Sequence, residues 1–157
     1  MRIAEINSSN FGSTGNIMLE IAEVAEKCGH SAVVCYPKSR ANAKKRKESD
    51  IVIGNRLSRN LHLKLAEITG LNGCFSYFST LNFLRKLNRF KPDIIHLHNL
   101  HNCYINLPLL FKYIKKHNIK TVWTLHDCWS FTGHCPHFDM IGCDKWKTGC
   151  YRCPQYK

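Results

Sequence analysis

Apolar and polar positions along the chain predict an alternation of strands and helices. A short apolar run at 2–6 precedes a polar segment, and residues 17–28 then place their apolar side chains on one helical face. The run SAVVCY at 31–36 is almost wholly apolar, as in a strand that is buried on both sides. Strand, polar loop, helix and strand in this order indicate a βαβ unit.

The remaining elements continue this alternation. We expect strands at 50–54, 94–98 and 120–125, and helices at 57–71, 79–90 and 105–118, the last with Pro108 near its first turn. Strands that alternate with helices predict an α/β fold with a doubly wound, mostly parallel sheet that is covered on both faces.

The segments after the first, fourth and fifth expected strands are rich in Asn, His, Ser and Gly. They read NSSNFGSTGN at 7–16, HNLHN at 98–102 and HDCWSFTGHC at 126–135. In a parallel sheet, the loops at the carboxyl ends of the strands converge, and ligands bind outside them. We therefore expect these three loops to share one cleft.

The first of these loops carries Gly12 and Gly15 just before the helix. Glycines there let the backbone approach a phosphate, and the N-terminus of a helix favours an anion. The loop is neither a GxGxxG fingerprint nor a P-loop, because no Gly-Lys-Ser/Thr follows. The same residues also allow a plain turn in which Ser13 or Thr14 is the N-cap of the helix.

Three histidines at the end of the fourth strand, His96, His98 and His101, raise the question of a metal site. His96 and His98 point to the same face of a strand, but the sequence places no carboxylate beside them. Hydrogen-bonded polar residues at a strand end are the alternative that we favour. His98 and Asn99 then become candidate substrate-binding residues, whereas His96 is expected to be buried and structural.

His126 and Asp127 end the fifth strand. A histidine can accept or donate a proton near neutral pH, and an adjacent acid can orient it or bind a sugar hydroxyl. A capping pair at the start of a loop is the alternative. The position at a strand end favours function, and we take both residues as catalytic candidates.

The chain ends in a cysteine-rich tail. Of its nine cysteines, Cys135, Cys143, Cys150 and Cys153 form an x7, x6, x2 spacing that differs from a standard zinc finger. Four thiolates suffice for a tetrahedral structural zinc, and His134 or His137 could substitute for one of them. Reduced or partly paired thiols remain the alternative.

Composition narrows the class of protein. The 157 residues carry 23 Lys and Arg against 11 Asp and Glu, a net charge of +12, which favours an anionic partner. No apolar run is long enough to span a bilayer, and the first residues do not resemble a signal peptide. We expect a cytoplasmic protein, with the basic run at 38–47 facing solvent or an anionic membrane rather than nucleic acid.

Four stretches carry a family resemblance: MRIAEINSSNFGSTGNIMLEIAEVAEKCGH, KPDIIHLHNLH, NLPLLFKYIKKHNIKTVWTLHDCWSFTGHC and GCDKWKTGCYRCPQ. Together they resemble the N-terminal half of family 4 glycosyltransferases, and the cysteine-rich stretch is the most specific part. These are retaining enzymes of GT-B architecture. The likeness is greatest to bacterial members that build capsule, exopolysaccharide or colanic-acid-like polymers.

The resemblance implies two Rossmann-like domains with the active site between them. The N-terminal domain would hold a saccharide or lipid-linked acceptor, and the C-terminal domain the nucleotide-sugar donor. The glycine loop, here Gly12, Gly15 and Asn16, would reach the donor phosphates, and His126 would lie near the transferred sugar. The resemblance implies a hexosyltransferase-type reaction that needs no catalytic metal, so a zinc ion would be structural.

We expect a Rossmann-like acceptor-side domain at 1–127, extended by a cysteine-rich loop at 128–157. The donor-binding domain of the family is absent from these residues, so we expect the chain to be inactive alone. Peripheral contact with the inner face of the membrane is a further expectation. A basic metal-binding module that recognises nucleic acid, or an inactive fragment that serves only as a partner, are the alternatives.

Overall fold

A computed structural model describes residues 1–43, 47–132, 135–150 and 152–154 of the chain. The chain divides into two compact units, Met1–His126 and Asp127–Lys157. The first unit contains the strands and the long helices, and the second contains the cysteine-rich tail.

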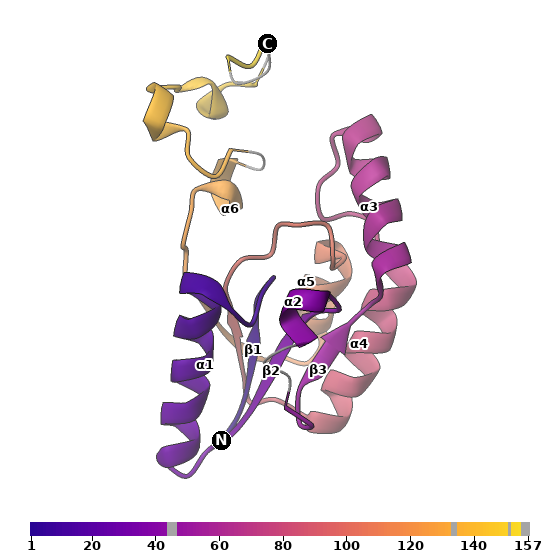
Figure 1. The fold of residues 1–157 in the computed structure, drawn as a ribbon, viewed down its shortest axis with the longest axis vertical. Helices are drawn as coiled ribbons and strands as arrows, with labels where there is room; N and C mark the ends of the chain where they lie inside the picture. The colour runs from indigo at the N-terminus through magenta and orange to yellow at the C-terminus, as the bar shows by residue number, and fades with distance from the viewer. Residues whose placement is uncertain (44–46, 133–134, 151, 155–157) are drawn as a thin grey trace. The chain divides into compact units, whose positions relative to one another are not determined.

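The first unit is built on a five-stranded sheet in which every pairing is parallel, with the strand order β3-β2-β1-β4-β5 (Figure 1). The strands are β1 Arg2–Ile6, β2 Ser31–Pro37, β3 Ile51–Ile53, β4 Ile94–Leu97 and β5 Lys120–Trp123. The chain moves outward from β1 to β3 and then returns to the other side of β1 at β4. This reversal between β1 and β4 is the position at which open α/β sheets bind ligands.

Helices flank the sheet on its two faces (Figure 1). α1 contacts β1 and β2, and α4 contacts β3 and the neighbouring α5. Because parallel crossovers are right-handed, the reversal of direction puts α4 and α5 on the face opposite α1. The helices are α1 Gly12–Lys27, α2 Arg40–Ala43, α3 Arg56–Thr69, α4 Tyr77–Phe90 and α5 Leu107–Lys116.

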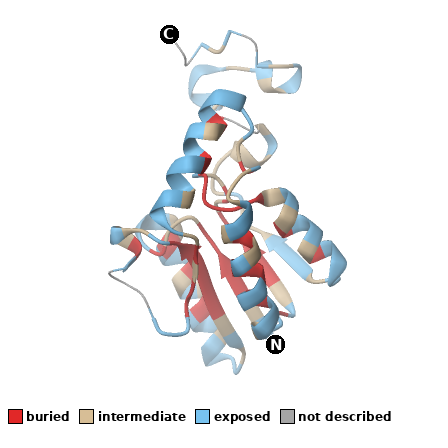
Figure 2. Cartoon of the chain, turned by 90° about the vertical axis from the view of Figure 1, so that its right-hand side faces the viewer, coloured by how far each residue is buried: buried red, intermediate tan, exposed pale blue. Residues whose placement is uncertain are grey.

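The core lies between the sheet and these helices (Figure 2). β1, β2 and β4 are apolar and buried over most of their length, as strands covered on both faces must be. On one face, Met18 and Ala22 of α1 pack with Val34 and Tyr36 of β2. The expected α/β fold with a doubly wound parallel sheet is confirmed, and its architecture is Rossmann-like.

The start of the first helix differs from the expectation. α1 begins at Gly12, so the glycine-containing segment forms its first turn rather than a loop before it. The N-cap is Phe11, and neither Ser13 nor Thr14 caps the helix, because both lie inside it. The apolar face expected from Ile17 onward was also wrong, because Ile17 and Val24 are exposed and the helix buries Gly15, Met18 and Ala22 instead.

The second unit has no strand among its described residues. Its elements are α6 Trp129–Thr132 and two single-turn 3-10 helices, η1 Asp139–Ile141 and η2 Lys145–Lys147. Phe131, Phe138 and Trp146 form an aromatic cluster with ring centroids 5.0–6.0 Å apart. Packing of this kind gives the unit its apolar centre.

No helix among the described residues is long and apolar enough to cross a membrane.

Candidate functional site

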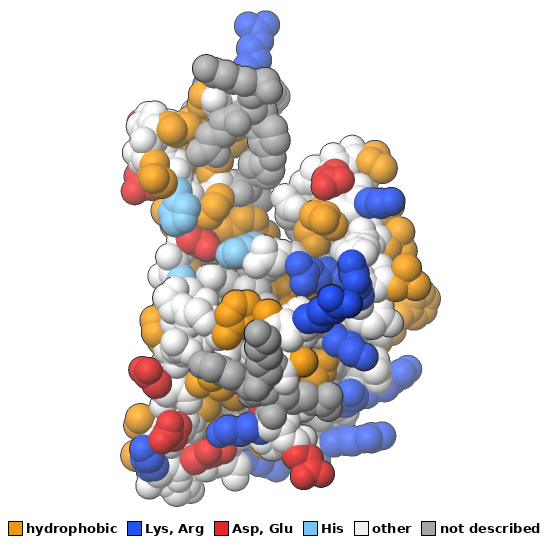
Figure 3. Space-filling model, viewed as in Figure 1, with side chains coloured by type: hydrophobic (Ala, Val, Ile, Leu, Met, Phe, Trp, Pro, Cys, Tyr) orange, Lys and Arg blue, Asp and Glu red, His pale blue; other side chains and the backbone are white. Residues whose placement is uncertain are grey.

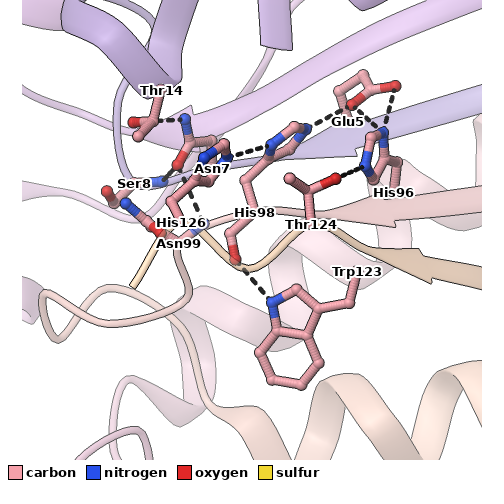
Figure 4. A network of polar contacts seen from close by, with 10 residues as sticks. All are labelled: Glu5, Asn7, Ser8, Thr14, His96, His98, Asn99, Trp123, Thr124 and His126. Carbon is pink, nitrogen blue, oxygen red and sulfur yellow. Dashed lines mark hydrogen bonds and ion pairs between the residues drawn. The ribbon is translucent and has the colours of Figure 1, made fainter. Parts of the chain in front are cut away.

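The carboxyl ends of β1 and β4 meet where the strand order reverses, and Asn7 joins the two strand ends. Its side chain is fully buried, and Oδ1 accepts from the amide of Ser8 at 2.8 Å and from that of Asn99 at 3.2 Å. Asn7 Nδ2 donates to Thr14 Oγ1 of α1 at 3.4 Å. Asn7 therefore connects the ends of β1 and β4 to the first turn of α1 (Figure 4).

A buried chain of hydrogen bonds leads from β1 through β4 to the end of β5 (Figure 4). Glu5 Oε2 lies 2.8 Å from Nε2 of His98, and His98 Nδ1 lies 2.9 Å from Nε2 of His126. The rings of His98 and His126 are stacked, with centroids 5.2 Å apart. Glu5 and His98 are almost fully excluded from solvent, so the carboxylate acts on His126 through a dry path.

His96 forms the second branch of the same network. Its Nδ1 lies 3.0 Å from Glu5 Oε2, and its Nε2 lies 2.8 Å from the hydroxyl of Thr124. The pairing of β1 with β4 puts Glu5 directly beside His96. His96 is buried, as expected for a structural residue.

One set of neutral tautomers satisfies every contact in this network. Ionised Glu5 only accepts hydrogen bonds, so His98 must carry its proton on Nε2 and His96 on Nδ1. His98 Nδ1 is then an acceptor, to which Nε2–H of His126 donates. The tautomer of His126 is therefore determined by a carboxylate two hydrogen bonds away.

The charge of Glu5 is stabilised inside the core. Burial alone would raise the pKa of this carboxyl, but the hydrogen bonds that His96 and His98 donate to it lead the effects that lower the pKa, and together these effects outweigh burial. Glu5 is thus ionised at neutral pH, which the tautomer assignment requires.

Glu5, His96 and His98 also place three ligand atoms within 4.8 Å of one another, close enough to share a metal ion. Both ring nitrogens of each histidine already have a polar partner in this arrangement. The hydrogen-bonded reading of the histidines therefore accounts for the geometry. The expectation that no carboxylate lies beside them was wrong, because Glu5 reaches them from the neighbouring strand.

The first turn of α1 packs tightly on the loop that follows β1. A Cβ on Gly15 would lie 2.8 Å from the backbone carbon of Asn10, so no larger residue fits without movement. Gly12 has a φ of +71°, which favours glycine, and a Cβ there would meet nothing within 4 Å. The N-cap residue Phe11 forms no side-chain hydrogen bond with the start of the helix. The first turns of α1, which include Asn16, lie at the edge of the sheet where the strands end.

Two aromatic side chains donate hydrogen bonds to backbone carbonyl groups of the loop after β4. Trp123 Nε1 donates to the carbonyl oxygen of His98 at 2.9 Å, and the hydroxyl of Tyr104 donates to that of Asn99 at 2.9 Å. The structure thus brings His98, Asn99 and His126 to one edge of the first unit, where Asn7 links Asn99 to Thr14 of α1. The third loop belongs to the second unit after His126, so a cleft shared by all three loops stays a prediction.

Asp127 belongs to the second unit, where Oδ1 accepts from the amide of Trp129 at the start of α6, at 3.0 Å. This is the capping alternative considered for this residue. A catalytic role for Asp127 stays a prediction.

The four candidate metal thiols lie near one another in the second unit. Burial raises the pKa of the Cys135 thiol, and Cys153, Cys150 and Cys143 raise it further, with a hydrogen bond between Cys135 and Cys153. Among the described residues, the group of side chains found close enough to share an ion is Glu5, His96 and His98, and it includes none of these thiols. His134, the possible substitute ligand, lies outside the described residues. A structural zinc stays a prediction.

Comparison with known proteins places the chain in a family. The sequence pattern of Glycosyltransferase Family 4 matches residues 14–149, which is most of the chain. The chain belongs to this family. The expected membership, which rested on the resemblance of four stretches of the sequence, is thereby confirmed.

Two relatives support this membership. A colanic acid biosynthesis glycosyl transferase of Escherichia coli, WcaC, is 44% identical over 68 residues, which cover 40% of this chain and 16% of the relative. A glycogen synthase of Desulfitobacterium hafniense is 41% identical over 58 residues, 34% of this chain and 12% of the relative. The matches therefore span less than a fifth of either relative. No solved structure matches the chain.

Sequence reasoning missed two residues of this candidate site, Glu5 and Asn7. A glutamate within the apolar strand RIAEI is a signal in itself, because an unpaired charge is very costly in a parallel sheet. The signal could have been combined with the two histidines of β4, since β1 and β4 flank the reversal of strand order. Asn7 carried no such signal, because Asn is common in any loop.

Proposed function

We propose that this chain is the acceptor-side part of a glycosyltransferase that moves a sugar from a nucleotide-sugar donor to a saccharide or lipid-linked acceptor in surface polysaccharide synthesis. The observation that carries the proposal is the Glu5–His98–His126 chain at the strand-end edge of a family 4 domain. A buried carboxylate that sets the tautomer of a histidine at a ligand-binding edge is more than a structural core requires.

In this proposal, His126 contacts the transferred sugar and the acceptor. The donation from His126 to His98 holds the ring in one orientation, so that the ring faces the reacting groups without reorganisation. Glu5 and His98 act as positioning residues. The buried carboxylate also favours any positive charge that His126 gains while the sugar is transferred.

The first turn of α1 provides the second element of the site. Its backbone amides and helix dipole favour an anion at Gly12, Gly15 and Asn16, as the phosphates of a nucleotide sugar require. The close packing of Gly15 on Asn10 keeps this turn in place. The sugar would be transferred with retention of configuration, and a second domain would supply most of the donor contacts.

The test is a transfer assay on a protein in which the donor-binding domain follows this chain. Product formation from nucleotide sugars, with the anomeric configuration read by NMR, establishes the reaction. We expect His126→Ala to lower turnover about 100-fold or more. His117→Ala, at the C-terminal end of α5 and thus at the opposite edge of the sheet, is the matched control and should leave the rate unchanged.

The 157 residues alone should transfer nothing. Transfer by this chain without a donor-binding domain would contradict the proposed division of labour. An unaffected rate in His126→Ala would reduce this histidine to a structural cap.

A further inference from the structure

A second feature of the first unit lies at the carboxyl ends of β2 and β3, next to the edge described above. It is an open hollow of about 880 Å³, bounded by the segment after β2 and by the start of α3. Its lining includes four cations and three amides: Lys38, Arg40, Arg56, Arg59, Asn42, Asn55 and Asn60. Tyr36 and Val52 line it as well.

Among the residues that the structure describes, no acidic side chain lines this hollow. Within the described part of the chain, none of the four cations forms an ion pair with a carboxylate. Four cations that surround one hollow repel one another unless an anion lies among them. The concentration of charge therefore indicates an anionic ligand, because a neutral sugar would be bound with amides and carboxylates instead.

The geometry of the donors suits a phosphate group in particular. Three of the four cations are arginines, whose planar donor groups bind two oxygens of a phosphate at once. Arg56 begins the 14-residue α3, and Asn55 caps it by accepting from the amide of Ser58 at 2.9 Å. The remaining amides of this helix start add a partial positive charge to the same hollow.

Hydrogen bonds connect the hollow to the candidate site. Asn42, which lines it, is buried and donates to the carbonyl oxygen of Pro37 at 2.7 Å. Asn10, in the loop before α1, donates from Nδ2 to the carbonyl oxygen of Asn42 at 2.9 Å. The segment that contains Asn42 therefore lies between the hollow and the loop that leads into α1. A ligand that crosses this segment would reach both the hollow and the first turn of α1.

An exposed apolar stripe starts at the rim of the hollow and runs along α3. Leu57, Leu61 and Ile68 lie four and seven residues apart, which puts them on one helical face, and they are 78%, 57% and 81% exposed. Leu57 itself lines the hollow. Figure 3 shows Lys and Arg side chains gathered beside α3, next to apolar side chains along its outer face. An anionic head and an apolar tail would match these two surfaces.

We propose that this hollow binds the phosphate or diphosphate group of a lipid-borne acceptor, while the stripe formed by Leu57, Leu61 and Ile68 lies against the lipid. The identification of the ligand as the acceptor rests on the proposed function. The binding site itself does not, because it is argued from charge and exposure alone. This assignment also sharpens the expected membrane contact, since it narrows the basic run at 38–47 to Lys38 and Arg40 and adds the start and exposed face of α3.

The test measures binding of the 157-residue chain to phosphatidylcholine vesicles with and without phosphatidic acid, whose headgroup is a phosphate monoester. We expect binding only to the phosphatidic acid vesicles, and competition by soluble pyrophosphate. The double variant Arg56→Gln/Arg59→Gln should bind about 10-fold more weakly or worse. Its matched control, Lys112→Gln/Lys116→Gln on α5, removes the same charge elsewhere and should retain nearly all binding.

A second pair of variants tests the apolar stripe. Leu57→Ser/Ile68→Ser should weaken vesicle binding while leaving the affinity for soluble pyrophosphate unchanged. Ile17→Ser/Val24→Ser, at exposed positions of α1, is the control and should behave as the unmodified chain.

Equal losses in the two charge variants would overturn the proposal, because net charge alone would then explain binding. Binding of pyrophosphate without any preference for phosphatidic acid vesicles would overturn the lipid source. Since neither readout requires sugar transfer, failure here is distinct from failure of the proposed reaction.

Discussion

The strand-end network and the cysteine tail place their chemical groups by different means. In the network, Glu5 and His96 are register partners on adjacent strands, and His98 follows directly after β4. In the tail, no sheet exists among the described residues, and the chain between the thiols is held by short turns and an aromatic cluster.

This difference predicts different responses to substitution. The strand register fixes the charge of Glu5 beside its histidine partners, and these histidines have no other carboxylate in the network. Loss of the Glu5 charge should therefore reduce the stability of the whole first unit. A group of thiols held by turns can rearrange locally, so its loss should affect only the tail. The predictions below test this contrast, from the largest expected effect to the smallest.

Glu5→Gln should have the largest effect on stability. The amide keeps the shape of the carboxyl but presents a donor group to histidines that also donate, so at least one buried hydrogen bond is lost. We expect a decrease in the free energy of unfolding of about 3 kcal/mol, measured by urea denaturation. Glu23→Gln, which removes an exposed partner of Lys27 on α1, is the control and should leave the midpoint nearly unchanged.

The stabilisation by Glu5 should depend on pH in a defined direction. Its pKa is lowered in the folded chain, so its contribution is present above the ordinary value of 4.5 and is lost as pH falls through the folded value. Unmodified chain and Glu5→Gln should therefore converge in stability in acid. A constant difference down to low pH would contradict the assignment of an ionised Glu5.

His62 shows what burial does to a histidine that has no carboxylate beside it. Burial lowers the pKa of this side chain from 6.5 to about 4, and its Nδ1 meets only the hydroxyl of Ser76, at 2.9 Å. The unfolded chain binds the proton more readily, so stability should fall by about 2–3 kcal/mol as pH decreases from 6.5 to 4.

His62→Leu should abolish this part of the pH dependence in urea denaturation, whereas the exposed-site control His117→Leu should retain it. An unchanged pH dependence in His62→Leu would mean that another group is responsible.

The tail should respond locally. If Cys135, Cys143, Cys150 and Cys153 hold a zinc ion, protein purified without chelator should contain about one zinc per chain by elemental analysis. Cys150→Ser should lose the ion and increase exchange of the tail amides, with the midpoint of the first unit unchanged. Cys28→Ser, at the C-cap of α1, is the control and should keep the metal. Metal-free protein with all nine thiols titratable would rule the site out.

Most of the fold could be predicted from the sequence, because apolar periodicity reports which faces are buried. The strands at 94–98 and 120–125 and the helix with Pro108 were recognised to within about two residues, since apolar runs and amphipathic spacing are strong local signals, even where the strand, as in β5, is largely exposed. The start of α1 was missed because its first turn, from Gly12 to Asn16, is polar and contributes little to the core.

The candidate site could be predicted only in part. His98, Asn99 and His126 were found from their place at strand ends, which requires no knowledge of partners. Glu5 was missed because its significance comes from pairing with β4, ninety residues away, and pairwise strand order is not a local property of the sequence. The hollow beside α3 was missed because its lining residues come from separate segments, from Tyr36 to Asn60, that only the fold brings together.

The most direct test of the account is a double-mutant cycle on kcat/KM in a protein that includes the donor-binding domain. If His98 acts through His126, His98→Asn should cost about 10-fold alone but less than about 2-fold in the background of His126→Ala. Fully additive losses, with His98→Asn costing the same in both backgrounds, would contradict the claim that the buried carboxylate and His98 act on catalysis by orienting His126.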